Sequence, residues 1–190
     1  MLFTLPKAEI KPFKRQKIDF YRRVFFMRKL NPHRFLRFRR VKKRDHLYFN
    51  LLSYLYFRKS DWRSSLLITR PEQLTLITII PYLLFNEIYL LRARRYFVIL
   101  KGQIAGTIAI RERNETLYVS SLAVSPCCRR LKIGTHILDF AAEIGREMRK
   151  RWLELSVVKQ NSPAYRLYRK YGFRIRQERR WSFIMRKEIE

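Results

Sequence analysis

The chain has 190 residues, with 43 Lys+Arg against 15 Asp+Glu and a formal net charge of +28. A chain of this length normally forms one domain, or one domain with an extension. Because 47% of the residues are hydrophobic and 14 Phe, 11 Tyr and 3 Trp are among them, the composition excludes a wholly disordered basic tail.

The positive charge is densest in the first third of the chain. Residues 1–62 hold 18 Lys+Arg against 4 Asp+Glu, and the rest of the chain carries the same net charge over about twice the length. No Gly/Ser-rich linker separates two halves. We therefore predict a basic, aromatic-rich N-terminal extension, 1–62, followed by a folded domain, 63–190.

Within the extension, residues 34–44 interleave apolar and basic side chains. Phe35, Phe38 and Val41 fall at i, i+3 and i+6, and Lys and Arg fill most other positions. This spacing predicts a helix with a narrow apolar stripe inside a cationic face. Three interpretations remain open: packing of the stripe on the domain, contact with RNA or the ribosome, and contact with an anionic membrane surface. The apolar run 46–57 that follows predicts a buried element but does not decide between strand and helix.

The most hydrophobic stretch, 74–91, is as long as a membrane span but contains Pro81, Asn86 and Glu87. A buried Glu is costly in lipid, and Pro is well tolerated in the first turn of a helix, so the stretch favours two short core helices that meet at Pro81. The two cysteines are neighbours in sequence and no secretory leader is visible. We expect a cytoplasmic protein.

The remaining elements follow at regular intervals. A capping box, Thr69 to Glu72, predicts the start of a helix after a short strand at 66–69. The further elements expected in chain order are helices over 72–92, strands at 96–100 and 103–110 joined by a Lys-Gly turn, a strand at 115–124, a helix at 133–151, a strand at 152–158, a helix at 162–171 that ends at Gly172, and strands at 173–177 and 181–185. This order predicts a mixed α/β layer with an antiparallel meander first and a parallel crossover later.

A basic turn inside this pattern is the first candidate site. The strand before it ends at Val124, Pro126 breaks it, and the turn 129–135 leads into a helix. The first amides of a helix lack partners and carry partial positive charge, so a phosphate or pyrophosphate is a natural ligand, and Gly134 would let the backbone approach it. A solvated loop is the alternative interpretation.

The second candidate is the segment NSPAYRLYRKYGF, 161–173. Taken together, the two segments resemble the GNAT superfamily of acyl-CoA-dependent N-acyltransferases, and the similarity covers about two-thirds of the chain. The second motif matches at Asn161, Ala164, Leu167, Tyr168, Lys170, Gly172 and Phe173. In the first motif Arg129 and Gly134 match, whereas Lys132 stands where the family usually has its first glycine.

The resemblance implies a GNAT-like mixed sheet, partly splayed and flanked by helices, with acetyl-CoA as cosubstrate. The expected cofactor-binding residues are Leu122, Ala123, Val124, Arg129, Arg130, Leu131, Lys132, Ile133, Gly134, Thr135 and Asn161. Tyr168 would protonate the departing thiolate. The implied activity is transfer of an acetyl group to a primary amine (a protein N-terminus, a lysine or a small amine) by direct attack.

The acceptor and the general base are left open by the sequence. Ser156 stands where some relatives carry a glutamate base, and Glu154, Glu112 and Glu115 are weaker alternatives. His33, His46 and His136 show no metal-ligand spacing, so we predict no metal. The alternative hypothesis is a non-catalytic basic module that binds the ribosome or nucleic acid on the same scaffold.

Overall fold

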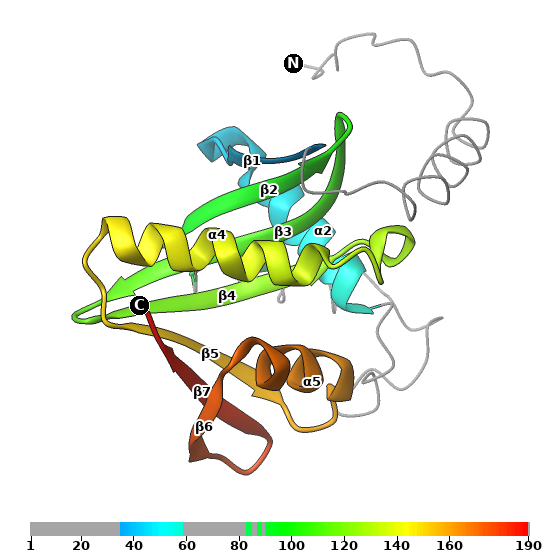
Figure 1. The fold of residues 1–190 in the computed structure, drawn as a ribbon. Helices are drawn as coiled ribbons and strands as arrows, with labels where there is room; N and C mark the ends of the chain where they lie inside the picture. The colour runs from blue at the N-terminus through cyan, green and yellow to red at the C-terminus, as the bar shows by residue number, and fades with distance from the viewer. Residues whose placement is uncertain (1–34, 59–82, 85–86, 89, 190) are drawn as a thin grey trace, which may run out of the picture.

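The computed structural model describes residues 35–58, 83–84, 87–88 and 90–189 (Figure 1). The predicted strand at 66–69, the capping box and most of the stretch 74–91 lie outside these residues. Within that stretch, residues 83–84 and 87–88 are helical. No helix in the described part of the chain is long and apolar enough to cross a membrane.

The described elements are arranged around one seven-stranded sheet. In chain order they are β1 (Leu36–Arg40), η2 (Lys43–Asp45), α2 (His46–Arg58), β2 (Arg94–Leu100), β3 (Gln103–Arg113), β4 (Thr116–Val124), η5 (Pro126–Cys128), α4 (Ile133–Glu147), β5 (Trp152–Val158), α5 (Ser162–Tyr171), β6 (Arg174–Glu178) and β7 (Ser182–Glu188). The strand order is β1-β2-β3-β4-β5-β7-β6, and only β4 and β5 pair in parallel. The predicted meander and parallel crossover are confirmed.

The helix predicted around residues 34–44 is wrong, because residues 36–40 form the edge strand β1. The strand pairs with β2 from Leu36↔Leu100 to Arg40↔Tyr96. Phe38 stacks on Phe140 of α4, with ring centroids 3.8 Å apart, whereas the Arg39 guanidinium lies over the Phe97 ring. Side chains thus alternate between the two sheet faces with the period of a strand.

The proposed division of the chain near residue 62 stays a prediction, and β1 and α2 both come from its first part. The run 46–57, whose type the sequence left open, belongs to α2. β1 is the edge strand of the sheet and α2 packs on the sheet, and side chains between Leu36 and Leu52 belong to apolar clusters shared with the C-terminal part.

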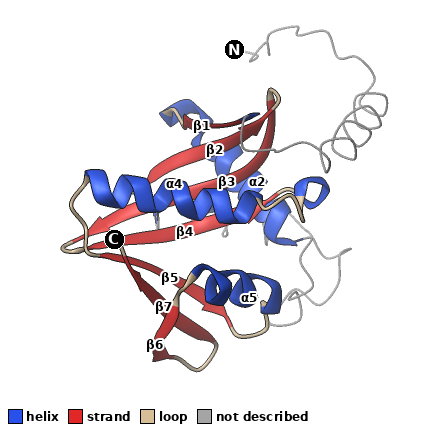
Figure 2. Ribbon diagram, in the orientation of Figure 1, coloured by secondary structure: helices blue, strands red, loops and turns tan. Residues whose placement is uncertain are grey.

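Helices cover both faces of the sheet (Figure 2). Helix α4 crosses one face over the main apolar cluster, which includes Ile108, Leu117 and Ile137. Helix α2 lies on the other face over a smaller cluster built around Phe49 and Phe97. The two layers hold the central strands β3 and β4 between them, and both strands are mostly buried.

The pairing of β4 with β5 ends early. It runs only from Thr116↔Trp152 to Val119↔Leu155. Beyond that point β4 stays paired with β3 as far as Val124, and β5 stays paired with β7 as far as Val158. The two strands therefore diverge, which agrees with the splayed sheet expected from the family resemblance (Figure 1).

An ion-pair cluster at the start of β2 attaches α2 to the sheet. Arg95, 2% exposed, donates two hydrogen bonds to the Glu87 carboxylate, at 2.7 and 2.9 Å. Asn50 donates to the same carboxylate at 2.7 Å, and His46 Nδ1 lies 3.0 Å from it. The Arg95 hydrogen bonds are the main reason that the pKa of Glu87 falls from its usual 4.5 to about 2.

This cluster predicts an acid-sensitive contribution to stability. A carboxylate with a lowered pKa stabilises the fold above its unfolded pKa, and this contribution is lost as pH falls from about 4.5 toward 2. Because the Glu87 side chain is 37% exposed and solvent screens its charge, Glu87→Gln should lower the free energy of unfolding by only about 1–2 kcal/mol at pH 7. Urea titrations from pH 7 to pH 2 should show a smaller loss of stability in the variant than in the wild type below pH 4.5. Parallel pH curves for the two proteins would contradict this role.

Candidate functional site

The open edge of β4 forms one wall of the candidate site. Leu122, Ala123 and Val124 lie at its C-terminal end, where β3 pairs with one edge and the pairing with β5 has ended. Within the described residues no strand pairs with this second edge, so its backbone groups can bond to an extended ligand as an added strand would. These are three of the residues expected to hold the cosubstrate.

The basic turn connects this edge to α4. Leu131 and Ile133 are buried, at 4% and 1% exposure, whereas Arg130 and Lys132 between and beside them are exposed. The two apolar side chains fasten the turn to the core. The two cations are thereby held at the surface, at the N-terminal end of α4.

The backbone of the turn is shaped to bind an anion. In the described part of the chain, no backbone carbonyl accepts a hydrogen bond from the five amides of residues 130–134. Arg130 and Lys132 have positive φ, +67° and +57°, and Leu131 between them does not. Such alternation turns neighbouring N–H groups toward one point, where a phosphate can bind. The Thr135 amide already donates to the Lys132 carbonyl at 3.0 Å.

The glycine at position 134 was expected to let the backbone approach an anion, but the structure gives a different reason for it. A Cβ at this position would lie 2.8 Å from Leu167 Cδ2, so the missing side chain lets α4 approach α5. Because the neighbour is a side chain of α5, the close approach is between helices. Its amide remains among the open ones at the helix N-terminus.

Helix α5 brings in the other expected residues. The Asn161 side-chain oxygen accepts a hydrogen bond from the Ala164 amide at 3.3 Å and so caps the helix. Gly172, with φ of +102°, ends it as predicted. Tyr168 is 6% exposed, and none of the described residues hydrogen-bonds to its hydroxyl. Burial raises the pKa of Tyr168 well above 10, which keeps its proton on at neutral pH.

Tyr171, one turn further along α5, has a hydroxyl that is already engaged. It donates to Asp139 of α4 at 2.8 Å, and burial together with this carboxylate raises its pKa. The two tyrosines therefore differ in a way that the motif does not reveal. Of the two, Tyr171 has a hydroxyl engaged by a described residue, and Tyr168 does not.

The carboxylates considered as general bases are poorly placed. Glu154 is buried, and its Oε2 accepts hydrogen bonds from Arg176 and Arg186, both at 3.0 Å. Glu112 and Glu115 lie at the β3–β4 turn, at the opposite end of β4 from the open edge. Ser156 is exposed on β5, just beyond the last residue that pairs with β4.

Cys127 and Cys128 lie just before the basic turn, where Arg129 and Arg130 would favour a thiolate. A hydrogen bond with the Cys127 thiol and then burial raise the pKa of Cys128, which disfavours its thiolate. The Cys127 sulfur also lies 3.0 Å from the Ser125 hydroxyl. The arginines that follow do not reverse this effect.

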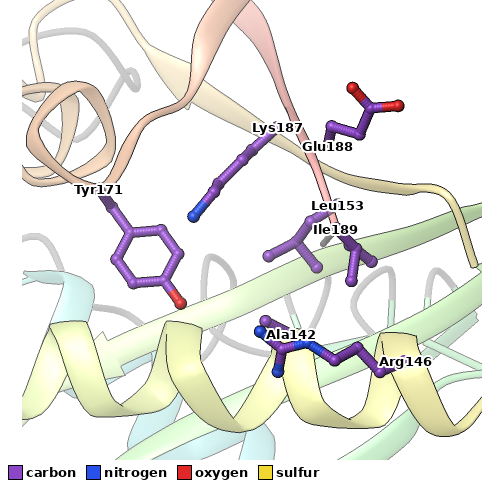
Figure 3. Close-up of a pocket in the computed structure, with 7 residues that line it drawn as sticks. All are labelled: Ala142, Arg146, Leu153, Tyr171, Lys187, Glu188 and Ile189. Atoms are coloured by element: carbon purple, nitrogen blue, oxygen red, sulfur yellow. The ribbon is translucent and has the colours of Figure 1, made fainter.

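A small hollow of about 50 Å³ lies between α4, α5 and the end of β7 (Figure 3). Tyr171, Lys187 and Arg146 are among its lining residues. Its floor includes Leu153, which belongs to the part of β5 that pairs with β4. The hollow has room for only a few water molecules and is separate from the open edge.

Sequence reasoning missed two hydrogen-bonded hydroxyls beside the open edge, those of Ser53 in α2 and Thr107 in β3, and the Ser121 backbone carbonyl that accepts from Thr107. Ser53 and Thr107 are both fully buried. The only available signal was Ser53 itself, a polar residue in the apolar run 46–57.

The positive φ at Lys132 generates a prediction that separates strain from charge. Lys132→Gly and Lys132→Ala both remove the ammonium group, but only the glycine relieves the left-handed conformation. We expect the glycine variant to be more stable than the alanine variant by about 0.5–1 kcal/mol. Both should bind acetyl-CoA more weakly than the wild type, by a similar factor. Chemical denaturation and calorimetric titration measure the two effects, and equal stability of the two variants would contradict the strain.

The chain was compared with known proteins. The family model of the GNAT family of acetyltransferases matches residues 60–173. No curated protein sequence matches the chain.

Solved structures with the same fold include acetyltransferases from three organisms. A GNAT-family acetyltransferase from Staphylococcus aureus Mu50 is 17% identical, with 82% of this chain and 99% of that one covered and a TM-score of 0.62. The PaiA N-acetyltransferase of Thermoplasma acidophilum, solved with coenzyme A, is 19% identical over 80% and 98% of the two chains, with a TM-score of 0.62. A Bacillus subtilis acetyltransferase, solved with CoA, is 15% identical over 82% and 99%, with a TM-score of 0.59.

The family match spans more than half of the chain, and the splayed strands, the basic turn and α5 lie where the motifs predicted them. The chain belongs to the GNAT family of acetyltransferases.

Proposed function

We propose that the protein is an N-acetyltransferase that moves an acetyl group from acetyl-CoA to a primary amine by direct attack. The observation that carries this proposal is the adjacency of two features at one end of the sheet. The open edge of β4 ends at Val124, and the five open amides of residues 130–134 follow within ten residues. An extended ligand that ends in a pyrophosphate fits them, with its extended part along the β4 edge and its pyrophosphate at the turn.

In this proposal the backbone binds most of the cosubstrate. Leu122, Ala123 and Val124 bond to the pantetheine arm, and the amides of the turn bond to the pyrophosphate. The ammonium of Lys132 and the guanidinium of Arg130 add positive potential at the same place. Binding along this length holds the thioester at the gap, so positioning supplies much of the rate enhancement.

The chemical step needs one proton delivered to the sulfur and one removed from the nitrogen. The neutral amine attacks the thioester carbonyl carbon, the C–S bond breaks as the C–N bond is completed, and the thiolate accepts the Tyr168 phenolic proton. The new amide loses its extra proton to water, from which the phenolate regains one. The burial that raises the pKa of Tyr168 also destabilises a thiolate beside it and so raises the pKa of the thiol. Burial therefore does not by itself disfavour proton transfer from the phenol to the thiolate.

The lack of a well-placed base bears on the acceptor. Within the described residues, each carboxylate considered is ion-paired or lies at the far end of β4. We propose that the amine enters in its neutral form. At pH 7 roughly one α-amine in ten is neutral, against about one lysine in 2,500. We therefore propose a protein or peptide N-terminus as the acceptor, in preference to a lysine side chain.

The basic first third would determine where the enzyme works. Arg37, Arg39, Arg40, Lys42, Lys43 and Arg44 are all exposed. Such a surface favours polyanions, so we propose contact with RNA, the ribosome or an anionic membrane surface. An acidic or neutral terminus, or a protein held on RNA, suits a protein of charge +28 better than a polycation. Neighbouring cysteines that form no disulfide are consistent with a cytoplasmic location.

The proposed acid can be tested with the two tyrosines of α5. The wild type should bind acetyl-CoA by calorimetry and acetylate peptides with free N-termini. Tyr168→Phe should lower kcat by about 10²–10⁴-fold with little change in acetyl-CoA affinity. Tyr171→Phe, the matched control, removes a hydroxyl that bonds to Asp139 and should lower stability by about 1 kcal/mol without lowering kcat.

Two results would oppose the proposal at different points. If the wild type binds no acyl-CoA, the activity itself is wrong. If it turns over and both phenylalanine variants keep full kcat, Tyr168 is only a core residue.

The proposed acceptor predicts a pH profile. With a peptide acceptor, log(kcat/KM) should rise with a slope near one up to the α-amine pKa of about 8 and then level off. An N-acetylated peptide with an internal lysine should react far more slowly at pH 7. Equal rates for the two acceptors would show that a base, not the acceptor's own pKa, controls proton removal.

A further inference from the structure

A bulge interrupts β4 at the open edge. The register passes from Thr107↔Ala123 to Ala109↔Ser120, so Ser121 and Leu122 together lie opposite one residue of β3. Ser121 has a φ of +48°, the one positive value in β4. A non-glycine residue in this conformation costs about 1–2 kcal/mol and persists only where its surroundings hold it.

Two buried hydroxyls hold the bulge. Ser53 of α2 donates to the Thr107 hydroxyl at 3.0 Å, and Thr107 passes its own proton on to the Ser121 carbonyl at 3.1 Å. Both side chains are 0% exposed. Each hydroxyl has a single proton, so the chain of bonds runs in one direction, from α2 through β3 to the bulge.

The direction of the Ser121 carbonyl sets the direction of the next amide. The peptide bonds are trans, and in a trans peptide the C=O and the following N–H point in opposite directions. The carbonyl points to Thr107, whose side chain lies on the α2 side of the sheet. The Leu122 N–H consequently points away from α2, at a place where pairing with β5 has already ended.

We propose that Ser53 and Thr107 are positioning residues, whose hydroxyl chain aims the Leu122 N–H at the thioester carbonyl in the gap between β4 and β5. This inference rests on the proposed acetyl-CoA-dependent function. An N–H held in this direction donates to the carbonyl oxygen and stabilises the negative charge that develops when the amine attacks. The hydroxyls touch neither substrate nor cosubstrate and act through the backbone.

Attachment of α2 to the sheet explains the bond from Ser53 to Thr107. It does not explain the bond from Thr107 to the Ser121 carbonyl. Attachment needs only the contact between Ser53 and Thr107. The Glu87–Arg95 cluster already attaches α2 at its N-terminal half, through His46 and Asn50. The bond from Thr107 to the Ser121 carbonyl fixes one peptide plane of β4, and this plane borders the gap.

The test is the infrared carbonyl band of acetyl-CoA labelled with ¹³C at the acetyl carbonyl, bound to the full-length protein without acceptor. A hydrogen bond from Leu122 should shift the band to lower wavenumber than in free acetyl-CoA. Thr107→Val, which keeps the shape but removes the hydroxyl, should return the band most of the way to the free value. Thr107→Ser should keep the wild-type shift, and Ser53→Ala should lose part of it.

Kinetics provide the second readout. Thr107→Val should lower kcat by about 10- to 100-fold and change the acetyl-CoA KM much less. Glu87→Gln is the matched control, because it weakens the attachment of α2 without touching the bulge, and it should keep the band position and kcat. If Thr107→Val fails to fold, the band positions of Ser53→Ala and Thr107→Ser are compared instead. The proposal requires a smaller shift in Ser53→Ala than in Thr107→Ser.

The outcomes separate this inference from the function on which it rests. Failure of the wild type to bind acetyl-CoA overturns both. Binding without a band shift, or an equal shift in the wild type, Thr107→Val and Ser53→Ala, overturns the positioning role alone. If the band moves in Glu87→Gln as much as in Thr107→Val, the hydroxyl chain serves only to attach α2 to the sheet.

Discussion

The early end of the parallel pairing between β4 and β5 is the constraint on which the rest of the structure depends. Four residue pairs join the strands, and each strand then continues with its other neighbour. A sheet that divides in this way must leave backbone groups open on a strand that is otherwise buried. Unsatisfied backbone groups at such a place are costly, so the division is best understood as a place for a ligand that completes the pairing.

Local backbone strain is part of this opening. Ser121, Arg130 and Lys132 are three of the six non-glycine residues with positive φ in the described part of the chain. Buried neighbours hold them there: Thr107 bonds to the Ser121 carbonyl, and the side chains of Leu131 and Ile133 fasten the turn to the core. The fold thus uses core packing and buried hydrogen bonds to maintain a backbone that the local sequence would not choose.

Much of the fold could be predicted from the sequence, because hydrophobic periodicity marks most elements from residue 96 onward. The motif around Asn161 and the basic turn also placed the expected site residues at neighbouring elements. The strand at 36–40 was mistaken for a helix, since Phe35, Phe38 and Val41 satisfy a helical spacing, and only pairing with β2 reveals the strand. The reason for Gly134 and the hydroxyl chain from Ser53 depend on contacts between distant segments, which no local pattern records.

The central claim is that an acyl-CoA completes the open edge of β4 and the basic turn. Hydrogen exchange with and without acetyl-CoA, followed by mass spectrometry, tests it directly. Within the described residues, the amides of 130–134 donate to no backbone carbonyl, and the edge of β4 that faces away from β3 has no strand partner over residues 122–124. The account predicts that acetyl-CoA slows exchange in two segments, 122–124 and 130–134, and leaves the amides of β1 and β2 unchanged. Binding of acetyl-CoA with protection elsewhere and none in these two segments would contradict it.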